Sequence, residues 1–427
     1  MRIDIVGKSD YFALALGSPK ALKIRASEPV APRLKNLTRA GANEPRTVLL
    51  LGATGFVGMH ILYELLQRKD VAKIYALVRK KRAASPEARL TASMRGYGLP
   101  LEKSDRLEVI DGDFTHGHQF GLSDAHYTKL LGSVDVVLNA AGATNHTYPY
   151  AYFRSEAIVP LLRMMEFCAT ERFKTLHFIG SMNGEVFRSK RDFLRFGFYH
   201  CGYSRMKWIV KYLAVWAREQ GLAASIYLPP HIVGSSLTAF KDPGLRYSFW
   251  HMVWYASQLR KVWDAEEPVP VISADALARS VCDNALLSEP RMFAYPASYI
   301  SSAEFAQAFG WTVVPWKEFR AELKRTFTFS LRKWNPKKPL SSVFDMLLHM
   351  FFTRALFTND LPDLISAITR AAQRHEPAVA TELPPSRYIH ECARRNYIIG
   401  RSMAAGALPS GQGEGVMALK ELTRERV

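Results

Sequence analysis

A tyrosine and a lysine four residues apart, Tyr203 and Lys207, are the first candidates for catalysis. On a helix, residues i and i+4 share one face, so the two side chains lie together. A protonated amine beside a phenol stabilises the phenolate and lowers the tyrosine pKa, which makes the phenol a usable proton donor at neutral pH. Ser181, 22 residues upstream of Tyr203, adds a hydroxyl that could hold a carbonyl oxygen. The three residues therefore predict proton transfer to a substrate oxygen.

A glycine-rich loop at residues 52–58, Gly-Ala-Thr-Gly-Phe-Val-Gly, is the second candidate site. It follows an apolar run and precedes residues with helical spacing, which is the context in which such a loop binds a dinucleotide. Gly52 permits a tight turn, Gly55 lets a pyrophosphate approach the backbone, and Gly58 lets helix and strand pack closely. The free N–H groups at the start of the helix then face the phosphates. The loop therefore predicts a dinucleotide site.

Arg79, 21 residues after Gly58, distinguishes between two dinucleotides. An enzyme that uses NAD carries Asp or Glu at the end of the second strand, where the carboxylate bonds the ribose 2′-hydroxyl. Here an arginine takes that place and three more cations follow at residues 80–82. A cation favours the 2′-phosphate of NADP, whereas the alternative is a solvated basic turn. We expect NADPH.

The candidate residues are positioned by a regular alternation of predicted strands and helices. Residues 48–51 form a continuous apolar run, typical of a strand buried on both faces, and further strands are predicted over residues 73–78, 107–110, 134–138, 175–179 and 224–228. Helical spacing predicts helices over residues 57–67 and 201–220. This alternation indicates a doubly wound parallel sheet of the Rossmann type, in which ligands bind beyond the carboxyl ends of the strands. The glycine loop, Arg79 and Ser181 all lie at such ends.

The pattern changes after residue 235, so we expect several parts. These are a basic N-terminal arm over 1–46, a cofactor-binding Rossmann domain over 47–235, a smaller, mostly helical substrate subdomain over 236–405, and a mobile tail over 406–427. Some segments of the subdomain should return to the Rossmann core. The arm is either a surface linker or a docking segment for a partner. An aromatic run from Phe249 to Tyr255 either packs in a core, which is the preferred interpretation, or lines an acyl tunnel.

Taken together, these residues resemble the extended short-chain dehydrogenase/reductase superfamily. More narrowly, they resemble the thioester reductase domains that terminate nonribosomal peptide synthetases and carboxylic acid reductases, with fatty acyl-CoA reductases of the male-sterility type as close relatives. The resemblance covers roughly residues 47–400 and is weaker after about 290. Its marks are the segments 51–58, 77–79, 112–114, 145–150, 177–181, 202–208, 268–271 and 314–316, and the single positions Pro229, Ile232 and Gly234.

The resemblance implies hydride delivery from NADPH to a thioester held on the phosphopantetheine arm of an acidic carrier protein. Loss of the thiol would give an aldehyde, and a second hydride an alcohol. By position, Ser181 matches the family's oxyanion residue, Tyr203 its acid, and Lys207 its partner for the ribose and for the tyrosine pKa. The implied cofactor contacts are Gly52, Thr54, Gly55, Phe56, Val57, Gly58, Arg79, Arg89, Asp113, Phe114, Ala141, Gly142, Ala143, Tyr203 and Lys207.

The chain departs from its relatives at two places. Many relatives carry Asn where this chain has Ala157, and Arg-Pro-Gly where it has Leu228-Pro229-Pro230. The Asn organises a proton relay in related enzymes, so a non-catalytic, cofactor-binding protein stays open as an alternative. No adenylation or carrier domain fits in the sequence, so we expect a free-standing reductase in natural-product biosynthesis. Two enzyme alternatives are a fatty acyl-CoA reductase and a sugar-nucleotide epimerase or dehydratase, although Arg79 argues against the latter, which usually uses NAD.

Composition narrows the classes of partner. The chain has 427 residues, 48% of them hydrophobic, and a formal net charge of +18, which favours polyanionic partners such as an acidic carrier protein. No basic recognition motif points to nucleic acid. Four widely spaced cysteines argue against a disulfide framework or metal site and suit a reducing cytosol. The sequence shows neither a signal peptide nor a spanning apolar stretch. We expect a cytoplasmic monomer.

Overall fold

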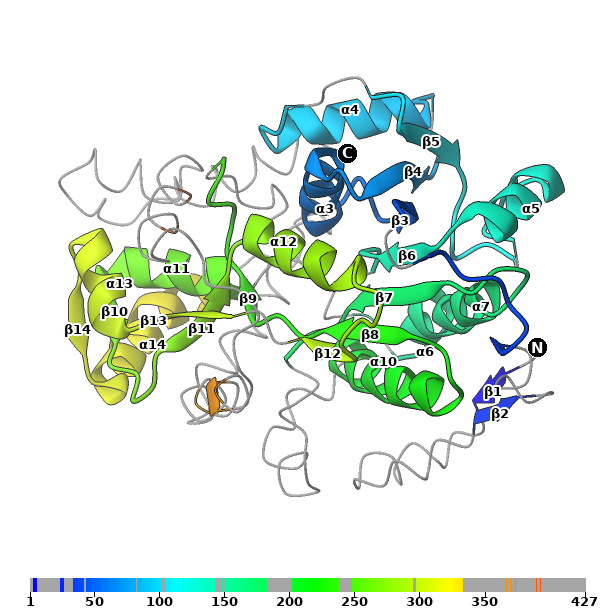
Figure 1. Cartoon of the computed structure of the whole chain (residues 1–427). Helices are drawn as coiled ribbons and strands as arrows, with labels where there is room; N and C mark the ends of the chain where they lie inside the picture. The colour runs from blue at the N-terminus through cyan, green and yellow to red at the C-terminus, as the bar shows by residue number, and fades with distance from the viewer. Residues whose placement is uncertain are drawn as a thin grey trace.

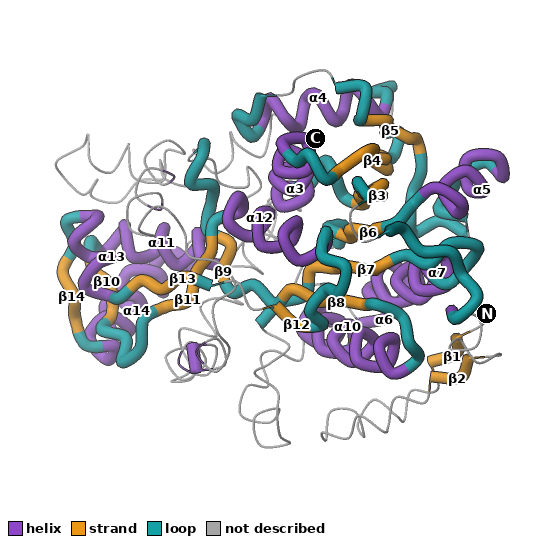
Figure 2. Tube along the Cα trace, in the orientation of Figure 1, coloured by secondary structure: helices purple, strands orange, loops and turns teal. Residues whose placement is uncertain are grey.

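Of the 427 residues, the computed structural model describes 3–5, 24–26, 34–41, 44–81, 83–100, 104–117, 119–142, 148, 150–182, 202–238, 248–294, 297–332 and the single positions 366, 369, 370, 373, 389 and 392 (Figure 2). The predicted tail over 406–427 lies outside the described residues, as does Ala143 among the expected cofactor contacts.

A seven-stranded parallel sheet forms the centre of the described structure (Figure 1). Its strands stand in the order β12-β8-β7-β6-β3-β4-β5, and each neighbouring pair is parallel. The strands are β3 (Arg46–Leu51), β4 (Val71–Val78), β5 (Leu107–Asp111), β6 (Val136–Asn139), β7 (Thr175–Ile179), β8 (Ala224–Tyr227) and β12 (Phe293–Ala294). The doubly wound parallel fold predicted from the apolar runs is confirmed.

Helices cover both faces of the sheet, which explains why most strand residues are apolar. One face carries α3 (Phe56–Gln67), α4 (Pro86–Gly96) and α12 (Ala274–Ala285), and the other carries α5 (Asp124–Ser133), α7 (Val159–Cys168) and α10 (Gly202–Glu219) (Figure 1). Successive strand residues point to opposite faces. Leu50 therefore joins the core beneath α3 and α12, whereas Leu49 and Leu51 join the core shared with α7 and α10.

The strand order reverses at β3, which lies between β4 and β6. In a doubly wound sheet, ligands bind at this switch point, because the connections on its two sides run over opposite faces. The loops that follow β3 and β6 lie against each other here, and the backbone N–H of Ala140 donates to the carbonyl oxygen of Leu51 across 3.0 Å. The fold thus places two predicted cofactor loops side by side.

A smaller set of elements follows the sheet and lies beside it (Figure 1). Its helices are α11 (Ser248–Leu259), α13 (Ser302–Phe309) and α14 (Trp316–Arg332). Two small sheets accompany them, which the sequence did not indicate. One has the order β13-β11-β9, and the other pairs β10 with β14. Their strands are β9 (His231–Ile232), β10 (Lys261–Trp263), β11 (Val269–Ile272), β13 (Ser298–Ile300) and β14 (Thr312–Val314).

Two segments beyond residue 235 belong physically to the large sheet. Strand β12 extends it by pairing with β8, and α12 packs on α3, where Arg68 forms an ion pair with Asp283. A buried polar network adds to this attachment: the hydroxyl of Tyr227 bonds the His177 ring across 2.9 Å and the Asn284 amide across 3.0 Å. Groups buried this deeply need partners, so the network fixes α12 against β7 and β8.

The N-terminal region contributes a two-stranded sheet, β1 (Ile3–Ile5) with β2 (Ile24–Ala26), and a short segment at residues 34–41. This segment is attached to the end of α7, because the backbone N–H of Phe173 donates to the carbonyl oxygen of Thr38 across 2.9 Å. The Arg39 guanidinium stacks 3.8 Å from the centroid of the Phe173 ring. Within the described part of the chain, no helix has the length and apolar character needed to cross a bilayer.

Candidate active site

The glycine loop joins β3 to α3 with almost no free space around two of its glycines. Gly52 has a φ of +80°, a conformation that favours glycine, and a Cβ there would lie 2.5 Å from the backbone nitrogen of Ala141. A Cβ at Gly58 would overlap the carbonyl oxygen of Gly52. The loop closes with a hydrogen bond of 2.9 Å from the Gly55 N–H to the Gly52 oxygen. These two glycines are therefore required by packing, as the sequence motif predicts.

Helix α3 begins without the features that normally cap a helix. Gly55 is its N-cap and supplies no side-chain bond, and its first turn contains no acidic residue. By contrast α4, α5, α12 and α13 each start with a serine cap and an acidic residue in the first turn. The first N–H groups of α3 and the positive end of its dipole are thus available to an anion.

The other loop residues divide into two kinds. Gly55 is exposed and Thr54 is half-buried, so both present surface at the loop. Phe56 and Val57 are buried, and their side chains pack in the core beneath α3. Only the main-chain N–H groups of Phe56 and Val57 can therefore reach a phosphate, which agrees with their expected role as the first residues of the helix.

Arg79 follows β4, and its guanidinium lies 3.3 Å from the carboxylate of Asp113 at the end of β5. Burial alone would raise the pKa of Asp113, but hydrogen bonds from Thr115 and the charge of Arg79 outweigh it, and the pKa falls below its ordinary value. Arg89 of α4 donates to the main-chain oxygen of Arg79. Burial and the neighbouring charge of Arg79 lower the pKa of Arg89. The structure thus brings all three predicted residues together.

The end of β6 supplies the facing wall of the glycine loop. The side-chain oxygen of Asn139 accepts a hydrogen bond of 3.0 Å from the backbone N–H of Ala141, which orders the turn. Ala141 packs on the core and Gly142 is exposed, with open space where a Cβ would be. Phe114, after β5, is half-buried against the same core. Asn139 was not among the expected contacts, although an Asn at a strand end before small residues could have indicated this turn.

Ser181 lies just past β7, next to the end of β8. The backbone of this strand end is tied on both sides of the serine: Gly180 donates to Tyr227 across 2.7 Å, and Met182 donates to Pro229 across 3.1 Å. Ser181 itself is half-buried, at the edge where the carboxyl ends of the strands meet. The hydroxyl is therefore carried by a strand end that two neighbouring segments hold in place.

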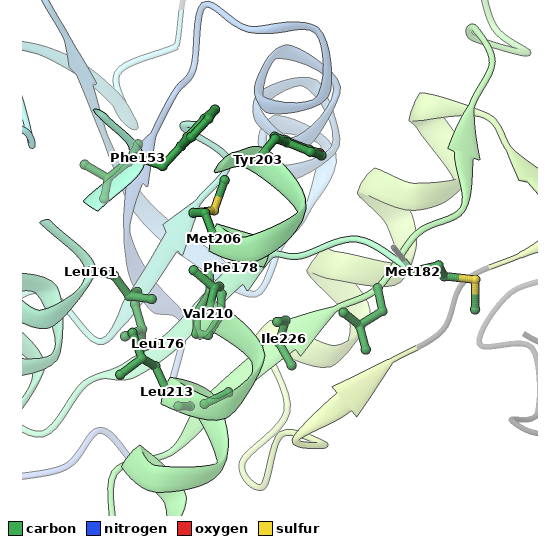
Figure 3. Packing of buried hydrophobic residues seen from close by; sticks show 14 of the residues in the cluster. Phe153, Leu161, Leu176, Phe178, Met182, Tyr203, Met206, Val210, Leu213 and Ile226 are labelled. Carbon is green, nitrogen blue, oxygen red and sulfur yellow. The ribbon is translucent and has the colours of Figure 1, made fainter. Parts of the chain in front are cut away.

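Tyr203 and Lys207 sit on the first turns of α10, as expected from their spacing. The Lys207 Nζ lies 5.6 Å from the centroid of the Tyr203 ring and donates a hydrogen bond of 2.9 Å to the carbonyl oxygen of Ile179. Burial lowers the pKa of Lys207 to about 8. Figure 3 shows Tyr203 at the start of α10, with the residues that follow along the helix facing β7: Met206, Val210 and Leu213 toward Phe178 and Leu176.

Ala157 stands where many relatives carry asparagine, and the backbone around it departs from a regular α-helix. Ala157 lies in a π-helical turn, η2 (Arg154–Ile158), between α6 (Tyr150–Phe153) and α7. Phe153, just before this turn, packs edge-on to Tyr203 with ring centroids 6.0 Å apart. Such wide turns often mark functional sites. The methyl group of Ala157 packs on the core and, unlike the side chain of asparagine, has no group that can form a hydrogen bond.

Two features near the site were not predicted from the sequence. The Ile179 carbonyl orients Lys207, and a main-chain acceptor of this kind leaves no residue-type signal. His231, in β9, stands two residues after the backbone partner of Met182 and belongs to no motif. Among the described residues, no cluster of His, Cys, Asp and Glu could hold a metal ion. His177 is buried in the network with Tyr227.

Comparisons with known proteins identify the family of the chain. The sequence model of the family described as "Male sterility protein" matches residues 50–281. The L-2-aminoadipate reductase large subunit of Penicillium chrysogenum is 31% identical over 223 residues, which cover 47% of this chain and 16% of the relative. A component of the linear gramicidin synthase of Brevibacillus parabrevis is 29% identical over 203 residues, 45% of this chain and 4% of the relative. This chain thus spans a small fraction of both relatives.

A solved structure supports the fold over nearly the whole chain. The terminal R domain from the myxalamid PKS-NRPS biosynthetic pathway superposes with a TM-score of 0.65, at 19% identity, and covers 91% of this chain and 98% of that domain. At this level of identity the likeness concerns the fold. It extends the agreement beyond the part that the family model matches.

Proposed function

The chain belongs to the male sterility protein family, and from this membership we propose that it is an NADPH-dependent reductase of acyl or peptidyl thioesters. The coarser part of this statement, an oxidoreductase that binds a nicotinamide cofactor, follows from the family and its fold. The cofactor, the chemistry and the partner are proposed below from the residues of the site.

The residues at the switch point fit a dinucleotide. Gly52 and Gly58 let the backbone approach closely, and α3 starts with free N–H groups and no competing acid. Arg79 lies where the ribose is expected, with its side chain 61% exposed and available to an added phosphate. An arginine fork matches a phosphate better than a hydroxyl, which supports NADPH over NADH. Asp113 is occupied by Arg79 and Thr115, so it does not take the place of an NAD-selecting acid.

The chemistry proposed for the chain's own residues concerns one oxygen atom. When bound, NADPH supplies the hydride that reduces the thioester carbonyl carbon. Ser181 donates a hydrogen bond to the carbonyl oxygen, and Tyr203 gives that oxygen its proton, which leaves a tetrahedral hemithioacetal. Lys207, held by Ile179, stabilises the phenolate that remains. Expulsion of the thiol from the hemithioacetal releases the aldehyde.

The observation that carries this proposal is the tie between α10 and β7. Lys207 reaches the Ile179 carbonyl, two residues before Ser181, from the same helix face as Tyr203. Burial also lowers the pKa of Lys207 to about 8, which supports a role for this amine beside Tyr203 together with its position. Two relatives, an L-2-aminoadipate reductase and a component of a linear gramicidin synthase, support a carboxyl-derived substrate carried by a synthetase-type system.

The proposed partner is an acidic carrier protein that presents the thioester on its phosphopantetheine arm. The net charge of +18 supports such a partner, because opposite charge speeds association at low ionic strength. Free CoA thioesters are also anionic, so a fatty acyl-CoA reductase is the second candidate. The two differ in whether the carrier protein itself raises kcat/KM over the pantetheine thioester.

The test is single-turnover reduction of a panel of thioesters, each offered on a carrier protein, on CoA and on pantetheine. We expect NADPH oxidation with equimolar release of aldehyde and thiol, fastest from the carrier protein. The Tyr203→Phe variant should bind NADPH normally and fail to turn over. A wild-type protein that binds NADPH but oxidises none with any thioester would refute the proposal and favour a cofactor-binding protein without catalysis.

A further inference from the structure

His231 occupies a position beside the proposed reaction centre that none of the roles above explains. The backbone N–H of Met182, which follows Ser181, bonds the carbonyl oxygen of Pro229 across 3.1 Å. His231 begins β9 two residues further on. The segment that leaves the large sheet at β8 therefore carries His231 past the end of β7 and into the smaller set of elements.

The register of β9 shows which way the imidazole points. His231 pairs with Val271 and Ile232 pairs with Ile272, so each pair shares one face of the small sheet. Ile232 and Ile272 pack in the core beneath α3 and α12. Val271 packs in the other core, which also contains Met182 and Tyr203. The His231 ring therefore lies on the side of the molecule that holds the proposed catalytic residues.

The His231 ring lies against helix α11. The His231 ring and the Phe249 ring lie 5.9 Å apart, centroid to centroid, at an angle of 41°. Phe249, Trp250 and Val253 are themselves buried, so the preferred interpretation of this aromatic run as core packing agrees with the structure.

Neither ring nitrogen of His231 makes a hydrogen bond in the described structure, whereas the buried rings of His177 and His60 each use at least one nitrogen. The His177 ring uses both of its nitrogens, and Nδ1 of His60 bonds the oxygen of Phe56 across 2.8 Å. In the described structure His231 has a ring contact with Phe249 but no hydrogen bond, although its side chain is half-buried. Burial lowers the pKa of His231 to about 4, so the ring is neutral near pH 7 and carries one donor and one acceptor.

We propose that His231 orients the substrate by a hydrogen bond to an amide or hydroxyl group on the acyl chain, near the thioester. This inference rests on the proposed thioester reductase function and assigns its substrate class as peptidyl or otherwise polar acyl thioesters, in preference to plain alkyl ones. A half-buried polar group without a partner penalises a chain that cannot hydrogen-bond to it. His231 acts here as a positioning residue and takes no part in proton transfer.

Two thioesters of nearly equal shape test the proposal. N-acetylalanyl-pantetheine carries an amide next to the reacting centre, and 2,4-dimethylpentanoyl-pantetheine replaces that amide with hydrocarbon. We expect the wild-type protein to prefer the amide substrate. His231→Leu should lower kcat/KM for the amide thioester about tenfold, the value of one lost hydrogen bond, and change the alkyl thioester less than about twofold. His231→Asn, which can still hydrogen-bond, should restore most of the loss.

An equal loss on both thioesters, or no loss on either, would overturn the assignment. A second measurement does not depend on turnover or on the variants folding well. In the wild-type protein with NADPH, the ¹⁵N resonances of the His231 imidazole should shift when the unreactive thioether analogue of N-acetylalanyl-pantetheine is added, and should not shift with the alkyl thioether. No shift with the amide thioether refutes the inference. A shift without reduction of any thioester leaves the His231 contact standing and refutes the reductase function instead.

Discussion

The Nζ of Lys207 donates a hydrogen bond to the main-chain oxygen of Ile179, 2.9 Å away, and so ties the helix that carries Tyr203 to the strand that leads to Ser181. Because the acceptor is a backbone atom at the carboxyl end of β7, its position follows from the fold. The amine has donors left for other groups, since an ammonium has three. The geometry of the whole trio therefore depends on the packing of α10 against β7.

The pH dependence of turnover should report on Lys207. Burial lowers its pKa to about 8, so the amine is charged below that pH and loses its proton above it. We expect kcat/KM to fall as the pH rises above about 8, because a neutral amine no longer stabilises the phenolate. Lys207→Arg should move this fall to higher pH, since a guanidinium stays charged. An alkaline limb that is the same in both proteins would exclude Lys207 as its cause.

Substitution of Tyr203 should separate chemistry from structure. Tyr203→Phe keeps the ring that packs on Phe153 and removes the proton donor. We expect kcat to fall about 10²- to 10⁴-fold, with the thermal midpoint and the NADPH dissociation constant unchanged. Tyr63→Phe, on α3, serves as the matched control and should keep full activity. Rapid-quench turnover and fluorescence titration give the two readouts, and a weakened NADPH affinity would show that the hydroxyl serves binding.

Removal of Arg79 should alter the choice of cofactor. Its exposed guanidinium is the group proposed to meet the 2′-phosphate. Arg79→Ala should raise the NADPH dissociation constant about 10- to 100-fold, the value of a lost charge-assisted bond, and leave that of NADH within about threefold. Lys129→Ala removes a different cation, one that pairs with Glu108, and should change neither. Equal losses for both dinucleotides would place Arg79 elsewhere in the site.

The large sheet could be predicted from the sequence because its strands are buried on both faces. Residues 48–51 are a continuous apolar run for that reason, and residues 175–179 contain three apolar residues. Strand β12 could not be predicted, since Phe293–Ala294 is two residues long and is extended only through its pairing with β8. The strands of the two small sheets beside the large sheet are also short, and their tertiary pairing decides their conformation.

The site divides in the same way. Gly52 and Gly58 were predictable because their close contacts with backbone atoms exclude any side chain, so only glycine fits at these positions. Tyr203 and Lys207 were predictable from helical spacing. The Ile179 carbonyl and the face on which His231 lies depend on strand register, which no local pattern of one sequence reveals. The contacts of the site residues with cofactor and substrate stay predictions.

A pair of glycine substitutions should test the close packing of the loop. In Gly58→Ala the new methyl would overlap the Gly52 oxygen, so α3 must move away from the loop. We expect a loss of about 1–3 kcal/mol in the free energy of unfolding and a marked loss of dinucleotide binding. Gly96→Ala, where a Cβ meets nothing within 4 Å, is the control and should be neutral or stabilising. Urea unfolding measures both, and equal stability of the two variants would contradict the geometry.

Acid should destabilise the fold through His177. Its pKa falls from 6.5 to about 3 on burial, so between these values the unfolded chain binds a proton that the folded chain does not. The contribution of His177 to the free energy of unfolding is therefore fully present above pH 6.5 and is lost as the pH falls toward 3. Its slope is at most about 1.4 kcal/mol per pH unit. His177→Gln should flatten the curve of unfolding free energy against pH, whereas the same substitution at the exposed His126 should not.

The contact between Gly52 and the backbone of Ala141 has a consequence for anyone who wishes to evolve this protein. A Cβ at residue 52 would lie 2.5 Å from the Ala141 nitrogen, so the loops after β3 and β6 pack too closely to admit a side chain there. Libraries that randomise residue 52 or residue 58 should return few folded clones, because a side chain at either position would overlap backbone atoms. Diversity is better placed at Arg79, Arg89 and His231, which lie at the rim of the two loops or beyond it. The route to a new cofactor or a new substrate is therefore through side chains placed around a scaffold that tolerates few changes.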